Sequence, residues 1–275
     1  MTVFEKISSL FKREHLVADL IFDMEKKITK ASSKNLKTDL WLYKKCFSLL
    51  MSSIRLSRTT LENNQAEKLL FQEVFVRLSV KIMNNGEAMH QLIQKGLYGS
   101  CFVLMRTLIF DVHMIWYLYL NPELIEPWLS ENFMSYKNRD WSEQFKEKTI
   151  IKNLEEKGKP YNLSISETTF SLYSKAGHPC FFSIRFFQNQ NGVLAYVPDF
   201  QFQTAQWMLW NIVGLLLYPT QIYLLHNKDD KTDELKRLGE EYARLMGTAN
   251  HFGLKVVDTH KNIYRARPLE EIKTT

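Results

Sequence analysis

The chain has 275 residues, of which 45% are hydrophobic and 24% charged, the balance of an ordinary soluble globular protein. This composition excludes wholesale disorder, a collagen-like fibre and a coiled-coil rod. The formal net charge of +6 permits acidic partners without requiring them. Basic residues are densest over 26–45, 137–159 and 255–267, where we expect ordinary solvated helix faces. Ten glycines and seven prolines are few for this length and favour long helices over turn-rich β folds.

Amphipathic helices are predicted along the first third of the chain, because apolar residues recur three and four positions apart. The expected helices span 2–30, 38–54, 66–83 and 87–95, with breaks at 31–35, 57–64 and 84–86. Asn84-Asn85-Gly86 is typical of a turn. Gly96 suits the left-handed position that ends a helix.

The most apolar segment, residues 98–120, contains no proline and predicts a helix of about six turns. Asn121-Pro122 is expected to end it, and Pro122 to open a short helix. A second apolar helix over 203–226 is expected to share its core. Further helices are predicted over 133–156, 164–176 and 232–246. Residues 181–197 contain two apolar runs around Asn191-Gly192, which suit a small β-hairpin or, equally, a partly ordered loop.

These elements predict an all-α protein with about eight to ten helices in a single bundle-like domain over 1–275. An N-terminal subdomain of loosely packed helices over 1–60 is the alternative. Apolar stretches at 101–120 and 207–225 approach membrane-span length. The first contains Arg106 and Asp111, and a charge at the bilayer centre costs at least about 2.5–3.5 kcal/mol. The stretch 207–225 is therefore the likelier membrane candidate of the two, but for both we expect buried core helices and no integral membrane insertion.

The three cysteines, Cys46, Cys101 and Cys180, lie far apart beside apolar residues and lack CxxC spacing. This pattern predicts reduced, buried thiols. The N-terminal residues contain no uninterrupted apolar stretch, so no secretory signal is expected. Both observations favour a cytoplasmic protein.

Polar residues within the apolar segment 98–120 need partners, because an unpaired buried charge costs several kcal/mol. Arg106 and His113 are seven residues apart and project from one helix face. Asp111 lies about 140° round the helix from Arg106 and is predicted to find its partner on another helix. The pattern indicates an interhelical polar network or a binding site.

Arg106 and the acid five residues later, followed by Tyr173-Ser174 and His178-Pro179, resemble a bacterial all-α family of unknown function. In that family a buried Arg–Glu pair accompanies a later His, whereas this chain has Asp111 in place of Glu. The resemblance covers roughly half of the chain and implies a fold but no activity. His178 and Tyr173 could join Arg106 and Asp111 in an anion-binding cluster, or His178 could simply cap a turn.

Arg106 and His113, separated by six residues, also resemble the helical motif of HEPN-type ribonucleases. Thr107 stands where that motif usually has Asn, Asp or His. The resemblance implies that His113 acts as general acid–base towards a ribose 2′-OH and that Arg106 stabilises phosphorane charge. It also implies a homodimer that binds RNA, with a role in phage defence or a toxin system.

No cofactor or metal is expected. Glu87 and His90 have the Glu-x-x-His spacing of di-iron bundles, but no second copy is present. The sequence lacks phosphate-loop, dinucleotide, zinc-protease and nucleophile-elbow motifs.

The expected function is non-enzymatic binding of a partner or small anion through Arg106, Asp111 and His178. A HEPN-like, metal-independent ribonuclease is the alternative.

Overall fold

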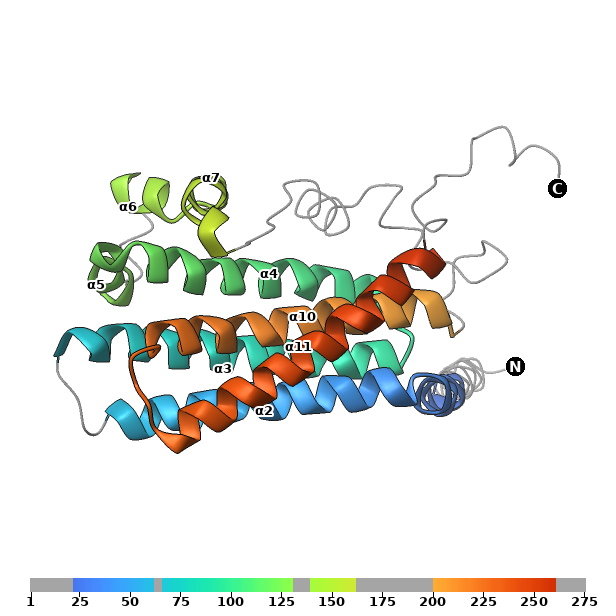
Figure 1. Cartoon of the computed structure of the whole chain (residues 1–275). Helices are drawn as coiled ribbons and strands as arrows, with labels where there is room; N and C mark the ends of the chain where they lie inside the picture. The colour runs from blue at the N-terminus through green and yellow to red at the C-terminus, as the bar shows by residue number, and fades with distance from the viewer. Residues whose placement is uncertain (1–21, 62–65, 131–138, 162–199, 261–275) are drawn as a thin grey trace, which may run out of the picture.

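The computed structural model of the protein describes residues 22–61, 66–130, 139–161 and 200–260 (Figure 1). These residues are mostly helical and contain no strand, which confirms the all-α class. The predicted helix over 164–176 and the predicted hairpin over 181–197 lie outside them. After a helical stretch over 22–35, the elements are α2 (Lys37–Leu61), α3 (Ala66–Gln94), α4 (Tyr98–Leu120), η1 (Pro122–Leu124), α5 (Ile125–Leu129), α6 (Arg139–Gln144), α7 (Glu147–Lys157), η3 (Lys159–Tyr161), α10 (Phe202–His226) and α11 (Asp233–His260).

Helix α10 occupies the centre of the bundle, where it packs against α2, α3, α4 and α11. Helix α11 crosses obliquely over α2 and α10, and the short helices α5, α6 and α7 lie around the far end of α4 (Figure 1). The two most apolar helices, α4 and α10, are therefore in contact, as the sequence predicted. Their observed bounds agree with the predicted ones to within one residue.

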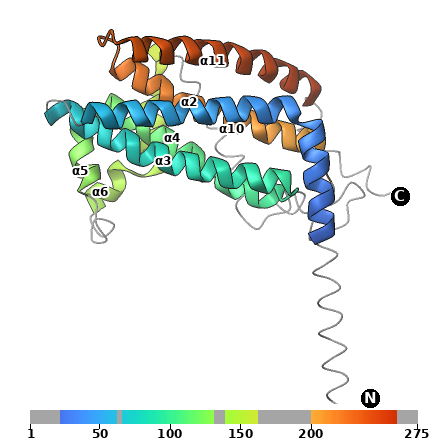
Figure 2. The ribbon, with the colours of Figure 1, turned by 90° about the horizontal axis from the view of Figure 1, so that it is seen from below.

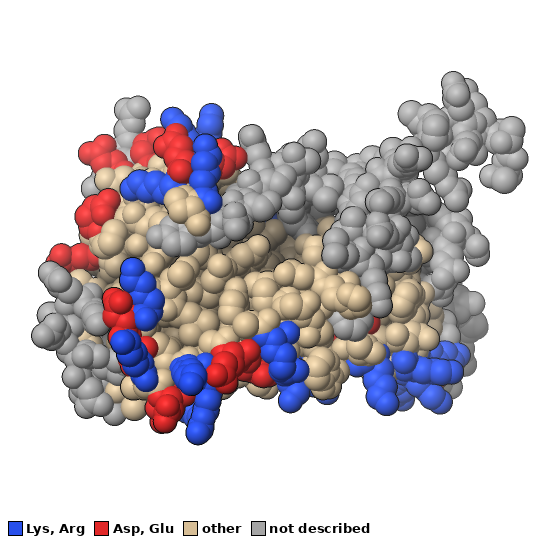
Figure 3. Space-filling view, viewed as in Figure 1, with Lys and Arg blue, Asp and Glu red and all other residues tan. Residues whose placement is uncertain are grey.

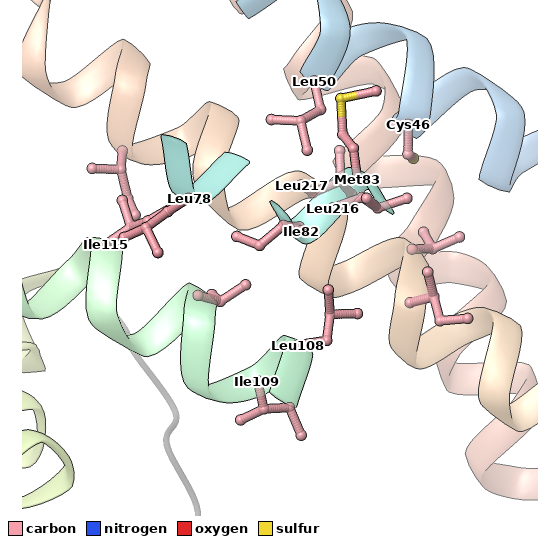
Figure 4. Packing of buried hydrophobic residues seen from close by; sticks show 14 of the residues in the cluster. Cys46, Leu50, Leu78, Ile82, Met83, Leu108, Ile109, Ile115, Leu216 and Leu217 are labelled. Atoms are coloured by element: carbon pink, nitrogen blue, oxygen red, sulfur yellow. The ribbon is translucent and has the colours of Figure 1, made fainter. Parts of the chain in front are cut away.

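One hydrophobic cluster joins the long helices. Cys46 and Leu50 of α2, Ile82 of α3, Leu108 of α4 and Leu216 of α10 are all buried and converge between the helices (Figure 4). Full burial of a Leu or Ile side chain stabilises a fold by roughly 1.5–3 kcal/mol. The long helices, including α2, therefore share a core. The single domain over 1–275 stays a prediction.

The turn predicted at Asn84-Asn85-Gly86 is wrong, because α3 runs through all three residues. Gly86 faces α10, and a Cβ placed there would lie 3.5 Å from Leu216 Cδ2. Asn85 uses its side-chain amide for a contact with Asp111 of α4. Packing on both neighbours therefore overrides the local preference of Asn and Gly for turns.

Other helix boundaries also differ from prediction. The first helix turns at Leu36 rather than within 31–35, and α2 continues into the polar stretch as far as Leu61. The helix predicted over 133–156 is divided into α6 and α7 in its described part. Helix α11 extends past Gly247 to His260. Tertiary packing thus lets these long helices continue through polar residues and glycines that locally favour a helix end.

The predicted helix stop at Gly96 is confirmed. Gly96 has φ 76°, the left-handed conformation that glycine adopts without steric cost. The Leu97 N–H donates to the Leu92 carbonyl at 2.8 Å, and the Gly96 N–H to the Ile93 carbonyl at 3.1 Å. These two bonds form a Schellman motif, which ends α3 and lets the chain reverse into α4.

Two glycines within α11 should respond in opposite ways to alanine. A Cβ at Gly247 would meet no atom within 4 Å, whereas one at Gly253 would lie 2.4 Å from Trp210 Nε1. Gly247→Ala should raise the free energy of unfolding by about 0.5–1 kcal/mol through helix propensity. Gly253→Ala should lower it by about 1–3 kcal/mol because the indole must move. Urea unfolding measures both, and equal effects would contradict this packing of α11 on α10.

Candidate functional site

Helix α4 separates the predicted site residues onto two faces. Asp111 points towards α3, where its partners lie, whereas Arg106 points towards α7. His113 shares the Arg106 side of the helix, as the seven-residue spacing requires. Arg106 and Asp111 therefore do not form one cluster. Tyr173 and His178 lie outside the described residues.

Asp111 forms a buried polar network between α3 and α4. Only 2% of its side chain is exposed, and Lys81 Nζ donates to Oδ1 at 2.7 Å. The Asn85 amide contributes a longer contact of 3.4 Å to Oδ2. Burial raises the pKa of Asp111, and Lys81 opposes that rise by stabilising the carboxylate. The structure confirms the prediction that Asp111 finds its partner on another helix.

Arg106 forms an ion pair between α4 and the start of α7. Its Nη2 donates to Glu147 Oε2 at 3.0 Å, and the two side chains are 37% and 28% exposed. Glu147 is the first residue of α7, where a carboxylate also interacts favourably with the N-terminal end of the helix dipole. The guanidinium is thus held by a carboxylate but remains within reach of solvent.

Tyr117 lies on the same face of α4 as Arg106, eleven residues further along the helix. The Tyr117 hydroxyl donates to the Gln144 carbonyl at 3.2 Å, and its ring meets Phe145 edge-on at 6.3 Å between centroids. These contacts hold the end of α6 against α4. Arg106 and Tyr117 therefore connect α4 to α7 and α6, as in the interhelical polar network that the sequence offered as one of two alternatives.

His113 lies between Arg106 and Tyr117 along this face. Burial lowers its pKa from 6.5 to about 4, because a charged imidazolium is disfavoured away from water. His113 is therefore neutral at pH 7. This protonation state bears directly on any catalytic role, since an acid–base group works best when its pKa is near the working pH.

Two residues of the observed networks, Lys81 and Glu147, were missed by sequence reasoning. Lys81 lies between the apolar Val80 and Ile82, which is a weak signal that a charged group approaches the core. Glu147 belongs to a charged surface helix and carries no such signal. Their pairing with α4 depends on how the helices pack.

The Glu87–His90 pair takes part in a hydrogen-bonded cluster with α2. The Tyr43 hydroxyl donates to Glu87 Oε2 at 2.9 Å, His90 Nδ1 lies 3.4 Å from the same oxygen, and the Tyr43 and His90 rings stack. Within the described ranges, no group of three His, Cys, Asp or Glu side chains could hold a metal ion. The Glu-x-x-His spacing therefore serves helix packing at this position.

The described cysteines are buried free thiols, as predicted. Cys46 lies in α2 and Cys101 in α4, whereas Cys180 lies outside the described residues. Burial raises the pKa of the Cys46 thiol to about 12 and raises that of Cys101 as well. Neither has the lowered pKa of a reactive thiolate, so both behave as core residues.

Helices α4 and α10 are each long and apolar enough to cross a membrane by length and composition alone. Within their most apolar windows, 72% and 61% of the residues respectively are buried inside the protein. Core helices of soluble proteins share these properties, so the expectation of no membrane insertion stays a prediction.

Comparison of the chain with protein-family models, with curated proteins and with solved structures found no match. The two resemblances described above therefore remain predictions from short motifs.

Removing the lysine from the Asp111 network should destabilise the protein. Lys81→Met leaves a buried carboxylate without its ion-pair partner and should lower the free energy of unfolding by about 1–3 kcal/mol at pH 7. Adding Asp111→Asn should restore most of that loss, because no buried charge remains. Urea unfolding of the single and double variants measures this coupling.

Arg77 provides the matched control, because it pairs with Glu73 on the exposed side of the same helix. Arg77→Met should change the free energy of unfolding by about 0–1 kcal/mol. If Lys81→Met is no more destabilising than Arg77→Met, the network does not stabilise the packing of α3 on α4.

Proposed function

We propose that this protein binds a small anionic group, such as a phosphate or a partner's carboxylate, at Arg106. The observation that carries the proposal is the half-buried Arg106–Glu147 pair, in which solvent still reaches the guanidinium. Arginine presents a planar fork of five donors that suits oxyanions. An anion that replaces Glu147 would also approach the N-terminal end of α7, where helix amides favour negative charge.

The proposed site differs from the predicted cluster in two residues of α4. Asp111 is engaged by Lys81 on the α3 side of α4, so it contributes to stability rather than to the ligand. His113 shares the Arg106 face and supplies a neutral, buried imidazole. Tyr173 and His178 stay predicted contributors. The proposed activity is binding without chemistry.

Titration with inorganic phosphate tests the proposal, with isothermal calorimetry as the readout. Arg106→Ala should weaken binding by about tenfold or more, because a charge-assisted hydrogen bond is worth about 1.5–3 kcal/mol. Glu147→Gln should strengthen binding, because it removes the carboxylate that competes for the guanidinium. These opposite shifts distinguish a ligand site from an ion pair that only holds α7.

The exposed pair of Arg77 and Glu73 again supplies the control. Arg77→Ala and Glu73→Gln should leave phosphate affinity unchanged. Equal affinities for wild type and Arg106→Ala, or weaker binding by Glu147→Gln, would overturn the proposal.

A HEPN-like ribonuclease is the second candidate, favoured by the position of Arg106 and His113 on one face of α4. The lowered pKa of His113 argues against it, because a histidine with a pKa of about 4 is a poor acid–base group near pH 7. Binding at Arg106 therefore ranks first.

Labelled RNA incubated with the purified protein in EDTA tests the ribonuclease candidate. A metal-independent ribonuclease should cleave the RNA, and Arg106→Ala and His113→Ala should each reduce the rate by about 10²-fold or more. Circular dichroism verifies that both variants are folded. Absence of cleavage, or cleavage that persists in both variants, rejects the candidate.

A further inference from the structure

The lysines around the start of α2 account for the net positive charge of the chain. Residues 26–45 contain seven lysines and one aspartate, so their net charge of +6 equals that of the whole chain. All seven lysines are exposed. They form what we call the lysine surface: Lys26, Lys27, Lys30, Lys34, Lys37, Lys44 and Lys45.

The fold directs these lysines away from the core. In the helical stretch 22–35, Ile28 and Ser32 are buried, so Lys30 and Lys34, each two residues further on, point to the opposite side. The chain turns at Leu36 into α2, which leaves at a wide angle (Figure 2). Lysine side chains gather at this corner of the molecule with few acidic neighbours in view (Figure 3).

Little of this charge is neutralised by the residues that the structure describes. Among the described residues, the ion pairs of the lysine surface are limited to that of Lys26 with Asp23, at 3.6 Å. Asp39, the aspartate within the range, accepts a hydrogen bond from Gln206 at 3.2 Å. Glu241 lies near Lys45 but forms its own close pair with Arg244. The remaining lysines are available to an external polyanion.

An exposed tryptophan lies within the lysine surface. Trp41 is 43% exposed and is four residues from both Lys37 and Lys45, so all three share one face of α2. An aromatic ring among basic residues is the arrangement on which single-stranded bases stack while lysines contact phosphates. A membrane anchor would need a broader apolar face, whereas Trp41 is the large exposed apolar residue between Lys26 and Lys45.

We propose that the lysine surface, together with Trp41, binds single-stranded nucleic acid. The lysines neutralise backbone phosphates, which supply most of the affinity of such complexes, and the indole stacks on a base. This surface lies on α2 and the helical stretch before it, whereas the proposed Arg106 site lies between α4 and α7. The two proposals can therefore fail separately.

Fluorescence anisotropy of a labelled 20-nucleotide oligouridine tests the proposal with the full-length protein. Replacement of Lys27, Lys30, Lys34 and Lys37 by Ala should weaken binding about tenfold or more. It should also make the dependence of log affinity on log salt concentration less steep by about 3, since each single-strand phosphate contact contributes about 0.7. Circular dichroism verifies that the variant is folded.

A matched variant removes four exposed basic residues around the turn from α10 to α11, where Asp229, Asp230 and Asp233 lie among them. Its substitutions to Ala are at Lys228, Lys231, Lys236 and Arg237. This variant should bind like the wild type. Equal weakening by both variants would show a general effect of net charge and would overturn the proposal.

Trp41→Ala tests the stacking contact. It should weaken binding of the single strand by about fivefold or more and leave binding of a duplex of the same length unchanged. No effect on the single strand would overturn the proposed preference. Binding to phosphatidylserine vesicles but not to the oligonucleotide would identify a membrane surface instead, and loss of oligonucleotide binding in Arg106→Ala would assign the binding to α4.

Discussion

The carboxylate of Asp111, buried between α3 and α4, is the constraint on which the arrangement of the bundle depends. An unpaired charge at this depth would cost several kcal/mol, so α3 must present Lys81 at the same level of α4. Lys81 is itself 55% exposed, which lets its aliphatic stem cross the interface while its charge stays near water. This pair therefore restricts the register and rotation of α4 against α3, together with the apolar packing between the two helices.

Once α4 is fixed in this way, its opposite face is determined as well. Arg106 and Tyr117 turn towards α7 and α6, where Glu147 and the Gln144 carbonyl accept their hydrogen bonds. One apolar helix thus supports packing on one side and holds a solvent-accessible guanidinium on the other. The separation explains why Arg106 and Asp111 act in two different places rather than in one cluster.

Sequence patterns predicted best where an element depends on its own residues. The bounds of α4 and α10 follow from their long apolar runs. The stop at Gly96 follows from backbone sterics. Prediction failed at Asn84-Asn85-Gly86 because the reasons for continuing the helix lie elsewhere: Asn85 contacts Asp111, and Gly86 packs against Leu216. Arg106 and Asp111 do not form the predicted single cluster, because they lie about 140° apart on α4 and pair with α7 and α3 respectively.

The sequence by itself determined that the protein is helical, that two apolar helices form its core, and that the charged groups within α4 require partners. These properties arise from periodicity, composition and the cost of burying charge, all of which act locally. Only the tertiary structure decided that Lys81 and Glu147 are those partners, and that lysines on either side of Leu36 form one exposed surface. The Lys81–Asp111 and Arg106–Glu147 pairs join residues 30 and 41 positions apart. They depend on how the helices pack rather than on any local pattern.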